Sequence, residues 1–492
     1  MSPPAITANP AGRRPAVLFM LSLLVGGVAW ASHSLVALVD ASQGNAREFA
    51  VVYVGAFLLV AWQTTLAYLE RPVRLTARQQ ARVERLRVTV NVPVHNEAPK
   101  LLAACLWSLL AQTRVPQRVQ VVVNGCSIRP YHQLLAEWRE GASVQGVQAD
   151  AVQIDPASKR LSHLTTFRDD PADIFVTIDS DTVLDRNALA EGLKPFADSR
   201  VQSVAGVAVA LNWNRNLLTR LTNLWYVTFQ LGLRSSLSTL GSVLVNSGAL
   251  ALYRSEVVRE GADGYAHETF LGRPVTLSDD SMLTTLAKLR GRTVQQPTCF
   301  AFTVLPERVG HHLRQQLRWM RGSFIRSWWR MRYLPLGSYA YWMHFASWVN
   351  FVLVTVVFAT LIVVRPVIDR RLVPSLLVIP VLVGYAVALK YVLIRRDDET
   401  LRSQLVTLLL APVAFLWSFF VLRPLRLYAI ATCLRTGWGT RTGGVEVTGA
   451  APRHIKQRRW PRPDRWGVRW GVAAVAGLAA CVAVALDILN LL

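Results

Sequence analysis

The sequence predicts a mostly parallel α/β domain set between membrane-spanning helices. The first observation is composition, because 52% hydrophobic and 17% charged residues in a chain of 492 lie outside the usual range of soluble domains. The second is order, because long apolar stretches occupy both ends of the chain and a more polar interval lies at 86–335. The third is the alternation of short apolar strands with helical segments inside that interval. The length allows two or three domains.

Several apolar stretches are long enough, at about 20 residues, to cross a bilayer as helices. They lie at 16–38, 48–68, 342–364, 372–394, 404–430 and 469–492. Ala29-Trp30-Ala31 in the first stretch offers a signal-peptidase site, but apolar sequence continues beyond it. We therefore expect an anchor there rather than a cleaved signal.

Charge predicts the orientation of these helices. The tail at 452–469 is rich in Lys and Arg and contains Asp464 as its acidic residue, so the positive-inside rule places it in the cytoplasm. The α/β interval is also expected in the cytoplasm, and an even number of crossings must separate the two. We therefore expect 342–364 and 372–394 to span the membrane and 469–492 to cross outward. The stretch 404–430, which Pro412 and Pro424 interrupt, is expected to lie in the interface or to re-enter.

The net charge of +23 comes from 54 basic and 31 acidic residues. Many of the basic residues border apolar segments, where retention on the cytoplasmic side explains them better than a nucleic-acid partner. The five cysteines are scattered and form no C-x-x-C pair. This argues against a disulfide framework or a zinc site and favours a reducing compartment.

Inside the polar interval, Arg87–Val94, Val119–Val123 and Ile174–Ile178 have the apolar pattern of buried strands. A helical segment at about 99–112 separates the first two, which is a βαβ arrangement. Strands that alternate with helices in this way form a mostly parallel sheet, and ligands bind at the carboxyl ends of its strands.

Two acidic pairs are candidates for chemistry. Asp179-Ser180-Asp181 ends the third strand, where two carboxylates on one side would hold Mg²⁺ or Mn²⁺ against a diphosphate. The alternative for this motif is a solvated turn. Asp279-Asp280 follows Ser278 and precedes an apolar helical run, so the alternative for this second pair is helix N-capping.

The segment 311–333 predicts an amphipathic helix. Its apolar residues recur at steps of three and four and form one stripe: Leu313, Leu317, Met320, Phe324, Trp328 and Met331. Its arginines lie off that stripe: Arg314, Arg318, Arg321, Arg326 and Arg330. This pattern is typical of a basic helix in the membrane interface, with arginines that extend toward the headgroups. Gln315, Arg318 and Trp319 share an arc of about 100°, so the alternative is that they face one site together.

Further motifs follow in a fixed order along the chain. They are Pro93–Glu97, Ser158–Arg160, Thr177–Thr182, Ser247–Gly248, Tyr253–Arg254, Thr269–Val275, Asp279–Asp280, Gly291–Val294, the Q-x-x-R-W run Gln315–Trp319, Leu422–Tyr428 and the W-G-T-R run Trp438–Arg441. In sequence and order they resemble the processive family-two glycosyltransferases of membranes, and most closely the bacterial hyaluronan synthases.

The resemblance implies a glycosyltransferase-A fold and an inverting transfer from UDP-sugars. Asp280 would be the catalytic base, and Asp181 would ligate Mg²⁺ or Mn²⁺. The nucleotide sugar would contact His95, Glu97, Asn124, Lys159, Asp179, Arg318, Trp438 and Arg441, the last two on a gating loop. The acceptor would contact Ser247, Gly248, Gln315 and Trp319.

The chain departs from the family pattern at four positions. His95 stands where many members carry Tyr, and Asn124 where they carry Asp. A His ring still stacks on uracil, and an Asn oxygen still accepts from the base N–H, although without charge assistance. Asn246 replaces a common Cys, and Ser278 replaces Gly. These departures leave the identity of the donor sugar open.

We therefore expect a multi-pass enzyme of the plasma (inner) membrane that polymerises UDP-sugars onto a growing polysaccharide acceptor and extrudes the product through the lipid bilayer. Hyaluronan, made from UDP-N-acetylglucosamine and UDP-glucuronate, is the leading product. No nucleic acid is expected and no protein partner is needed. The alternatives are a chitin-like or other single-sugar β-polymer synthase, a non-processive lipid-linked glycosyltransferase, and, from a different class, a non-catalytic membrane scaffold or export partner.

The expected organisation is two N-terminal transmembrane helices in 1–70, the cytoplasmic α/β domain at 86–310, the amphipathic interface helix at 311–335, two transmembrane helices in 342–394, the interfacial or re-entrant segment at 404–430, a gating loop and basic linker at 431–468, and a C-terminal transmembrane helix at 469–492.

Overall fold

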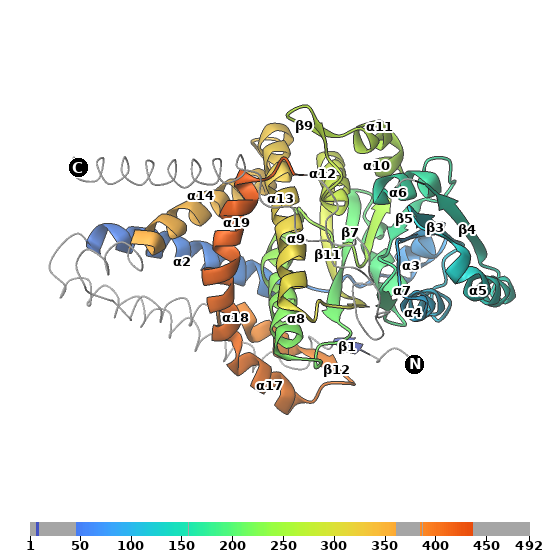
Figure 1. Cartoon of the computed structure of the whole chain (residues 1–492), viewed down its shortest axis with the longest axis horizontal. Coiled ribbons are helices and arrows are strands. Elements are labelled where there is room, and N and C mark those ends of the chain that lie inside the picture. The colour runs from blue at the N-terminus through green and yellow to red at the C-terminus, as the bar shows by residue number, and fades with distance from the viewer. Residues whose placement is uncertain (1–5, 9–45, 156, 361–383, 386, 436–492) are drawn as a thin grey trace, which may run out of the picture.

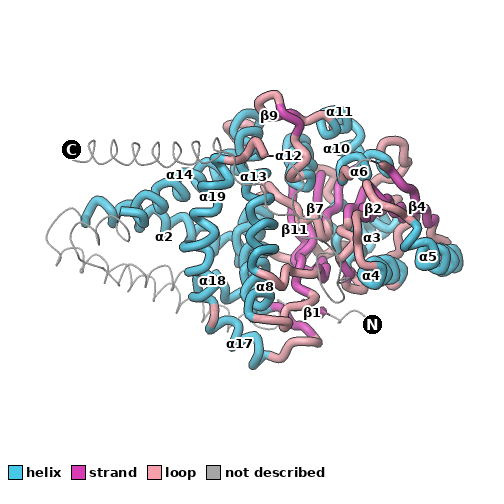
Figure 2. Tube along the Cα trace, in the orientation of Figure 1, coloured by secondary structure: helices cyan, strands magenta, loops and turns pink. Residues whose placement is uncertain are grey.

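A mixed eight-stranded sheet forms the centre of the protein (Figures 1 and 2). The structure is a computed structural model that describes residues 6–8, 46–155, 157–360, 384–385 and 387–435. The strand order is β4-β3-β2-β5-β8-β7-β11-β6. Strands β4, β3, β2 and β5 are parallel to one another, whereas β8 is antiparallel to both its neighbours and β6 is antiparallel to β11. The strand bounds are β2 Val88–Val94, β3 Arg118–Asn124, β4 Gln148–Ile154, β5 Ile174–Thr177, β6 Thr182–Leu184, β7 Val201–Ala210, β8 Ala251–Arg254 and β11 Arg292–Thr303.

The inner parallel strands β2, β3 and β5 are buried because helices cover both faces of the sheet, whereas the edge strand β4 is mostly half-buried. Every residue of β2 is buried, and so is every residue of β3 after Arg118. Leu102, Leu106 and Trp138 pack on these strands in the main hydrophobic core. The predicted mostly parallel sheet is confirmed, and the three predicted strands begin and end within one residue of those observed.

Helices connect and cover these strands. Their bounds are α3 Ala77–Glu84, α4 Pro99–Leu110, α5 His132–Val144, α6 Lys159–Phe167, α7 Ala188–Leu193, α8 Leu217–Phe229, α9 Ser235–Thr239, α10 Ser255–Glu260, α11 Ala262–Ala266, α12 Asp279–Arg290 and α13 Val309–Tyr333. Shorter helical turns are η1 Arg129–Tyr131, η2 Lys194–Ala197, η3 Gln230–Arg234 and η5 Leu389–Leu393. Two small antiparallel pairs join β9 Thr269–Phe270 to β10 Arg273–Pro274 and β1 Ile6–Ala8 to β12 Ile394–Arg396.

A group of apolar helices extends from one side of the sheet domain (Figure 1). Helix α2, Ala46–Leu69, lies beside α14, Tyr339–Ala359, and the Trp62 indole donates to the Tyr339 hydroxyl over 3.0 Å. The other members are α17 Leu401–Leu409, α18 Ala411–Trp417, the π-helical turn η6 Ser418–Leu422 and α19 Arg423–Ala431. Among the described residues, two helical stretches are long and apolar enough to cross a membrane, Tyr339–Val357 and Ala411–Ala431.

The predicted membrane topology is only partly covered by these elements. The predicted stretches 48–68 and 342–364 coincide with α2 and with α14 as far as Ala359. The stretches 16–38 and 469–492 and most of 372–394 lie outside the described residues. Within 404–430, Pro412 and Pro424 occupy first turns of α18 and α19, where proline is tolerated. An interfacial or re-entrant position for this segment stays a prediction.

Helix α13 matches the predicted helix at 311–333 but differs in the face it buries. The residues that it buries against the protein include Gly322, Arg326 and Arg330, whereas Trp328 of the apolar stripe is exposed. The prediction that all five off-stripe arginines belong to a solvated interfacial face was therefore wrong for Arg326 and Arg330. A buried carboxylate and buried hydroxyl and carbonyl groups bind these two side chains and replace the water they would otherwise contact.

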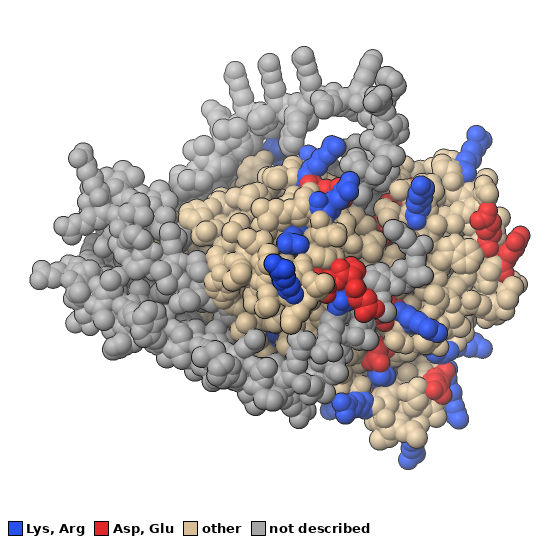
Figure 3. Space-filling view, turned by 90° about the horizontal axis from the view of Figure 1, so that it is seen from below, with Lys and Arg blue, Asp and Glu red and all other residues tan. Residues whose placement is uncertain are grey.

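The surface of the sheet domain carries charges of both signs. On the face shown in Figure 3, Lys and Arg side chains lie among Asp and Glu side chains. Opposite charges on this face therefore partly neutralise one another.

Candidate active site

The carboxyl ends of β2 and β3 bring the first two candidate residues together. His95 follows β2, and its Nδ1 lies 2.6 Å from the backbone oxygen of Asn124, the last residue of β3. The Asn124 side-chain Nδ2 donates to the Val94 carbonyl over 3.0 Å. That bond fixes the orientation of the amide group, and the Asn124 oxygen is the side-chain atom that can accept from a base N–H.

Glu97 connects this end of the sheet to the acidic motif after β5. Its carboxylate is almost fully buried and accepts hydrogen bonds from the Ser180 hydroxyl (3.0 Å) and the Ala98 N–H (3.1 Å). Ser180 and Asp181 are only 2% and 6% exposed, so the alternative of a solvated turn at Asp179-Ser180-Asp181 does not hold. The structure shows a packed acidic loop at the end of β5.

Three carboxylates gather around the buried thiol of Cys105 on α4. Burial raises the pKa of this thiol, and the negative charges of Asp181, Glu97 and Asp179 raise it further. The thiol also donates to the Asp179 backbone oxygen over 3.8 Å. The charges of both Asp179 and Asp181 therefore influence the same buried thiol inside the domain.

Lys159, the first residue of α6, forms an ion pair with this motif. Its Nζ lies 2.6 Å from Asp179 Oδ1 and 3.4 Å from Asp279 Oδ2. Burial alone would lower the pKa of Lys159, but the carboxylates of Asp179 and Asp279 outweigh burial and raise it. Lys159 therefore carries its positive charge at any physiological pH.

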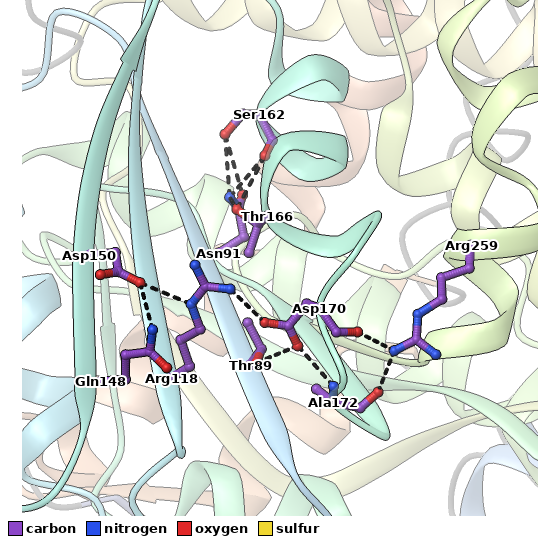
Figure 4. A network of polar contacts seen from close by, with 10 residues as sticks. All are labelled: Thr89, Asn91, Arg118, Gln148, Asp150, Ser162, Thr166, Asp170, Ala172 and Arg259. Atoms are coloured by element: carbon purple, nitrogen blue, oxygen red, sulfur yellow. Dashed lines mark hydrogen bonds and ion pairs between the residues drawn. The ribbon is translucent and has the colours of Figure 1, made fainter.

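Helix α6 is held in place by a polar network behind the site (Figure 4). The Asn91 Nδ2 on β2 donates to the Ser162 carbonyl over 3.2 Å and also to the Thr166 hydroxyl. Arg118 on β3 bridges Asp150 and the buried Asp170 with contacts of 3.0 and 2.8 Å. These bonds satisfy polar groups inside the sheet and fix the helix whose first residue is Lys159.

Gly248 lies directly against the Lys159–Asp179 pair. A Cβ atom added at this glycine would meet Asp179 Oδ2 at 2.9 Å and Lys159 Nζ at 3.2 Å. The neighbouring Ser247 accepts a turn hydrogen bond from Leu250 (3.2 Å), and the chain then enters β8, which pairs with β5. The motif resemblance assigned Gly248 to the acceptor, whereas the side chains nearest to Gly248 belong to Asp179 and Lys159, which were assigned to the nucleotide.

The second acidic pair opens helix α12 beside Lys159. Ser278 has a left-handed backbone with φ 55° and makes no side-chain cap, so the expectation of Ser278 as a capping side chain was wrong. Asp280 Oδ1 instead accepts from the Ser281 N–H over 2.7 Å. Both carboxylates thus lie in the first turn of α12, where orphan N–H groups favour negative charge.

The two carboxylates of this pair differ in proton affinity. Burial raises the pKa of Asp280 to about 6, and the neighbouring Asp279 adds to the increase. Burial alone would also raise the pKa of Asp279, but the positive charge of Lys159 reverses the shift and lowers it. Asp280 is therefore the member of the pair that takes up a proton near neutral pH, as a general base must.

The candidate residues on α13 lie further along the helix. Gln315 is buried, Arg318 is partly buried, and Trp319 is 37% exposed with its ring 5.8 Å from the Tyr226 ring of α8. Helix α13 meets α12 one to three turns beyond Trp319, where Gly322 lies against Ser278. Trp438 and Arg441 lie outside the described residues.

The donor set suits a hard divalent cation. Asp179 and Asp181 supply carboxylate oxygens, and the missing side chain of Gly248 leaves room beside Asp179 Oδ2. In the part of the chain that the structure describes, no group of three or more His, Cys, Asp or Glu residues is arranged to hold a metal ion. Mg²⁺ is commonly held by one or two carboxylates, with substrate phosphates and water as the other ligands, so two carboxylates fit this use.

Sequence reasoning assigned no contact in the site to several residues that the structure places here. Asp279 contacts Lys159, and Ser180 contacts Glu97. Glu268, Arg326 and Arg330 form a buried polar group behind α12. The spacing of four among Gly322, Arg326 and Arg330 was a usable signal for an inward-facing stripe, since such residues share one face of a helix.

Comparison with known proteins agrees with this geometry. Residues 85–322 match the family described as "Glycosyltransferase like family 2". The chain is 33% identical to a hyaluronan synthase of Streptococcus pyogenes over 357 residues, which is 72% of this chain and 83% of that protein. The chain belongs to glycosyltransferase family 2. It is a hexosyltransferase similar to hyaluronan synthases, which confirms the resemblance seen in its motifs.

This family-two glycosyltransferase is also similar to an N-acetylglucosaminyltransferase and, in structure, to a mannosyltransferase. An N-acetylglucosaminyltransferase of Azorhizobium caulinodans is 32% identical over 241 residues, 48% of this chain and 60% of that protein. Among solved structures, the mannosyltransferase PcManGT from Pyrobaculum calidifontis, in complex with GDP-Man and Mn²⁺, superposes with a TM-score of 0.50 at 21% identity. The match covers 78% of this chain and 99% of that one and supports a glycosyltransferase-A-like fold.

Proposed function

We propose that this family-two glycosyltransferase polymerises UDP-sugars processively and extrudes the polymer across the membrane. Hyaluronan, from UDP-N-acetylglucosamine and UDP-glucuronate, is the proposed product. The observation that carries the proposal is the position of Asp280, a partly buried carboxylate of raised pKa in the first turn of α12, next to Asp279, which contacts Lys159. The similarity to a hyaluronan synthase across most of both chains supports the choice of product.

In this proposal the donor lies over the ends of β2, β3 and β5. His95 and Asn124 face the uracil, and Glu97 holds the acidic loop through Ser180. Lys159 supplies positive charge beside the diphosphate, and Asp179 holds Lys159 in place. Arg318, Trp438 and Arg441 complete the donor site as α13 and the gating loop approach it.

Asp181, with Asp179, would hold Mg²⁺ or Mn²⁺ against the diphosphate. The structurally similar mannosyltransferase is in complex with Mn²⁺, which supports the use of a divalent cation in this proposal. A cation bound there neutralises negative charge on the departing nucleotide. The carboxylates do not distinguish the two metals, because both prefer hard oxygen ligands.

The reaction follows from the acidic pair on α12. The acceptor hydroxyl oxygen attacks the anomeric carbon of the donor as its proton passes to the free oxygen of Asp280. The bond between the anomeric carbon and the diphosphate oxygen breaks, and UDP leaves with that electron pair. Asp280 Oδ1 already accepts from the Ser281 N–H, which fixes the direction of Oδ2. Gln315 and Trp319 on α13 contact the acceptor sugar, with Trp319 as its stacking surface.

The membrane part of the proposal rests on the apolar helices. The two stretches Tyr339–Val357 and Ala411–Ala431 are long enough to span, and α13 exposes Trp328 near them. We propose that the domain at 86–310 faces the cytoplasm, with α13 in the interface and the polymer leaving through the chain's own spans. The product would then pass from the acceptor site into the membrane without release.

A single-sugar polymer is the second candidate. Relatives from Azorhizobium caulinodans and Bradyrhizobium diazoefficiens are N-acetylglucosaminyltransferases, at 32% and 30% identity. This favours N-acetylglucosamine as a donor in both candidates, and the need for a second donor distinguishes them.

The test is to supply the full-length chain, reconstituted in vesicles with Mg²⁺ or Mn²⁺, with each UDP-sugar singly and in pairs. The product is then digested with linkage-specific hydrolases. Polymer that forms only with UDP-N-acetylglucosamine and UDP-glucuronate together, and that hyaluronidase degrades, is the expected result. Polymer from one donor would replace hyaluronan with the second candidate, and no UDP release from any donor would contradict both.

A further inference from the structure

One face of helix α13 is joined to the first turn of α12 by buried polar contacts. Gly322, Arg326 and Arg330 follow one another at intervals of four residues and lie on this face. A Cβ at Gly322 would come within 2.9 Å of Ser278 Cβ, so the missing side chain of Gly322 lets α13 pack directly against the Ser278 side chain. Arg326 and Arg330 are 0% and 4% exposed. Long cationic side chains are seldom buried to this degree unless they have partners.

Arg330 reaches the residue that holds the proposed base. Its Nη2 donates to the Ser281 hydroxyl over 2.7 Å and also to the Leu244 carbonyl. The Ser281 N–H in turn donates to Asp280 Oδ1 over 2.7 Å. Ser281 is therefore fixed from one side by Arg330 while its backbone fixes the carboxylate of Asp280.

The Leu244 carbonyl ties the same guanidinium to a second part of the site. Leu244 lies four residues before Gly248, which contacts the Lys159–Asp179 pair. Between them, the Asn246 N–H donates to the Thr284 hydroxyl of α12 over 3.0 Å. Arg330 thus connects α13 with both the helix of the base and the loop beside the donor.

Arg326 makes a parallel connection through Glu268. It binds both Glu268 oxygens at 2.8 and 2.9 Å, and Arg160 binds the same carboxylate at 2.6 Å. Arg160 also donates to the Leu277 carbonyl, just before α12, and it follows Lys159 in sequence. The Glu268 carboxylate is shared by two arginines, one from α6 and one from α13.

Such buried ionic groups are weak sources of stability, because desolvation offsets most of their attraction. Burial lowers the pKa of Arg330 to about 9, which shows how strongly its charge is desolvated. A helix that only needed to pack on α12 would do so with apolar side chains. Instead, α13 directs hydrogen-bond donors at the residue next to the base, where geometry matters most for proton transfer.

We propose that Arg330 is a positioning residue for glycosyl transfer, which sets the orientation of the Asp280 carboxylate through its hydrogen bond to Ser281. The proposal rests on the proposed function of Asp280 as the base. It predicts that loss of the Arg330–Ser281 bond slows turnover without weakening the binding of the nucleotide.

The experiment compares Arg330→Lys, Ser281→Ala and the double variant in the full-length chain. Arg332→Lys is the matched control, because Arg332 is exposed on the same helix. UDP release gives kcat and the donor KM, calorimetry with UDP gives nucleotide affinity, and hydrogen exchange reports the amides of 279–286. Ser281→Ala is the milder change and keeps every charge in place, so it tests the bond even where Arg330→Lys disturbs packing.

Each single variant is expected to lower kcat by about 10-fold to 100-fold, because misplacing a catalytic group by about 1 Å costs about 100-fold. UDP affinity and donor KM should stay within about twofold, and the double variant should be no slower than the slower single variant, because both remove one bond. Faster exchange at 279–286 is expected in both single variants but not in Arg332→Lys.

An unchanged kcat in Ser281→Ala, multiplicative losses in the double variant, or equal losses of kcat and UDP affinity would overturn the proposal. Absence of UDP release by the unmodified chain would instead contradict the proposed function. In that case hydrogen exchange still decides whether Arg330 anchors α12, since unchanged exchange in Arg330→Lys and Ser281→Ala would exclude such anchoring.

Discussion

Substitution of Gly248 by alanine tests the geometry of the donor site at a single atom. The added Cβ would lie 2.9 Å from Asp179 Oδ2 and 3.2 Å from Lys159 Nζ, which are themselves 2.6 Å apart. Real Cβ atoms essentially never come within 3.0 Å of a heavy atom outside their own residue and its chain neighbours. The ion pair or the loop must therefore move. The methyl group also fills the room that a diphosphate or a cation needs.

The magnitude follows from this overlap. Fitting a diphosphate into room that the methyl group already occupies costs about 1–3 kcal/mol, as overpacking does, which corresponds to a loss of UDP affinity of about 5-fold to 150-fold. The assay is calorimetric titration of Gly248→Ala with UDP in the presence of Mn²⁺. The melting temperature, measured alongside, should remain close to that of the unmodified chain, because Gly248 lies in a site rather than in the main core.

Gly264→Ala is the matched control. A Cβ at Gly264, on α11, has no heavy atom within 4 Å, so UDP affinity should be unchanged and stability equal or slightly higher. Unchanged UDP affinity in Gly248→Ala would refute the assignment of Asp179 and Lys159 to the nucleotide.

Three further outcomes are expected. Ser278→Gly should raise the free energy of unfolding by about 0.5–1 kcal/mol, because glycine adopts φ 55° without strain. Gly322→Ala should destabilise the chain, because its Cβ would strike Ser278, and adding Ser278→Gly should recover that loss. Thermal melts check both variants, and a double variant as unstable as Gly322→Ala would contradict the packing. The raised pKa of Asp280 places the acidic limb of the kcat/KM profile at about pH 6, because the base must be ionised. Below that pH, kcat/KM should fall about tenfold for each pH unit. An acidic limb near pH 4 would mean that Asp280 is not the base. Removal of divalent cations with EDTA should abolish UDP release and addition of Mg²⁺ or Mn²⁺ should restore it, whereas full activity in EDTA would remove the metal role proposed for Asp181.

The sheet and the edge that carries the site were predictable because their signals are local. Fully buried parallel strands such as β2 give continuous apolar runs, and the rule that ligands bind at carboxyl ends singled out Asp179 after the third strand. His95 and Asn124 were named from the motif resemblance, and they lie at the ends of β2 and β3. Their side-chain contacts, such as Lys159 with Asp179, connect segments 20 residues apart and followed from the motif resemblance rather than from periodicity.

The orientation of α13 could not be predicted in the same way. Arg326 and Arg330 fit a basic interfacial face equally well until their partners are known, and Glu268 lies 58 residues away in sequence. Arg326 and Arg330 are buried because they bind Glu268 and Ser281, which are distant in sequence, and no local pattern encodes such contacts. The left-handed backbone of Ser278 was also not predictable from local sequence. Ser before Asp-Asp is typical of a helix-capping residue. In the structure, however, Gly322 packs against the Ser278 side chain, and the Ser278 backbone does not adopt the capping geometry.

We propose that Asp280 takes the proton of an acceptor hydroxyl in a UDP-sugar transferase. The most direct test measures UDP release by the purified full-length chain and by Asp280→Asn, which keeps the shape of the side chain and removes the base. We expect the rate of UDP release to fall by about 100-fold to 10,000-fold in Asp280→Asn, while UDP affinity and the melting temperature are retained. Release at the rate of the unmodified chain would contradict it.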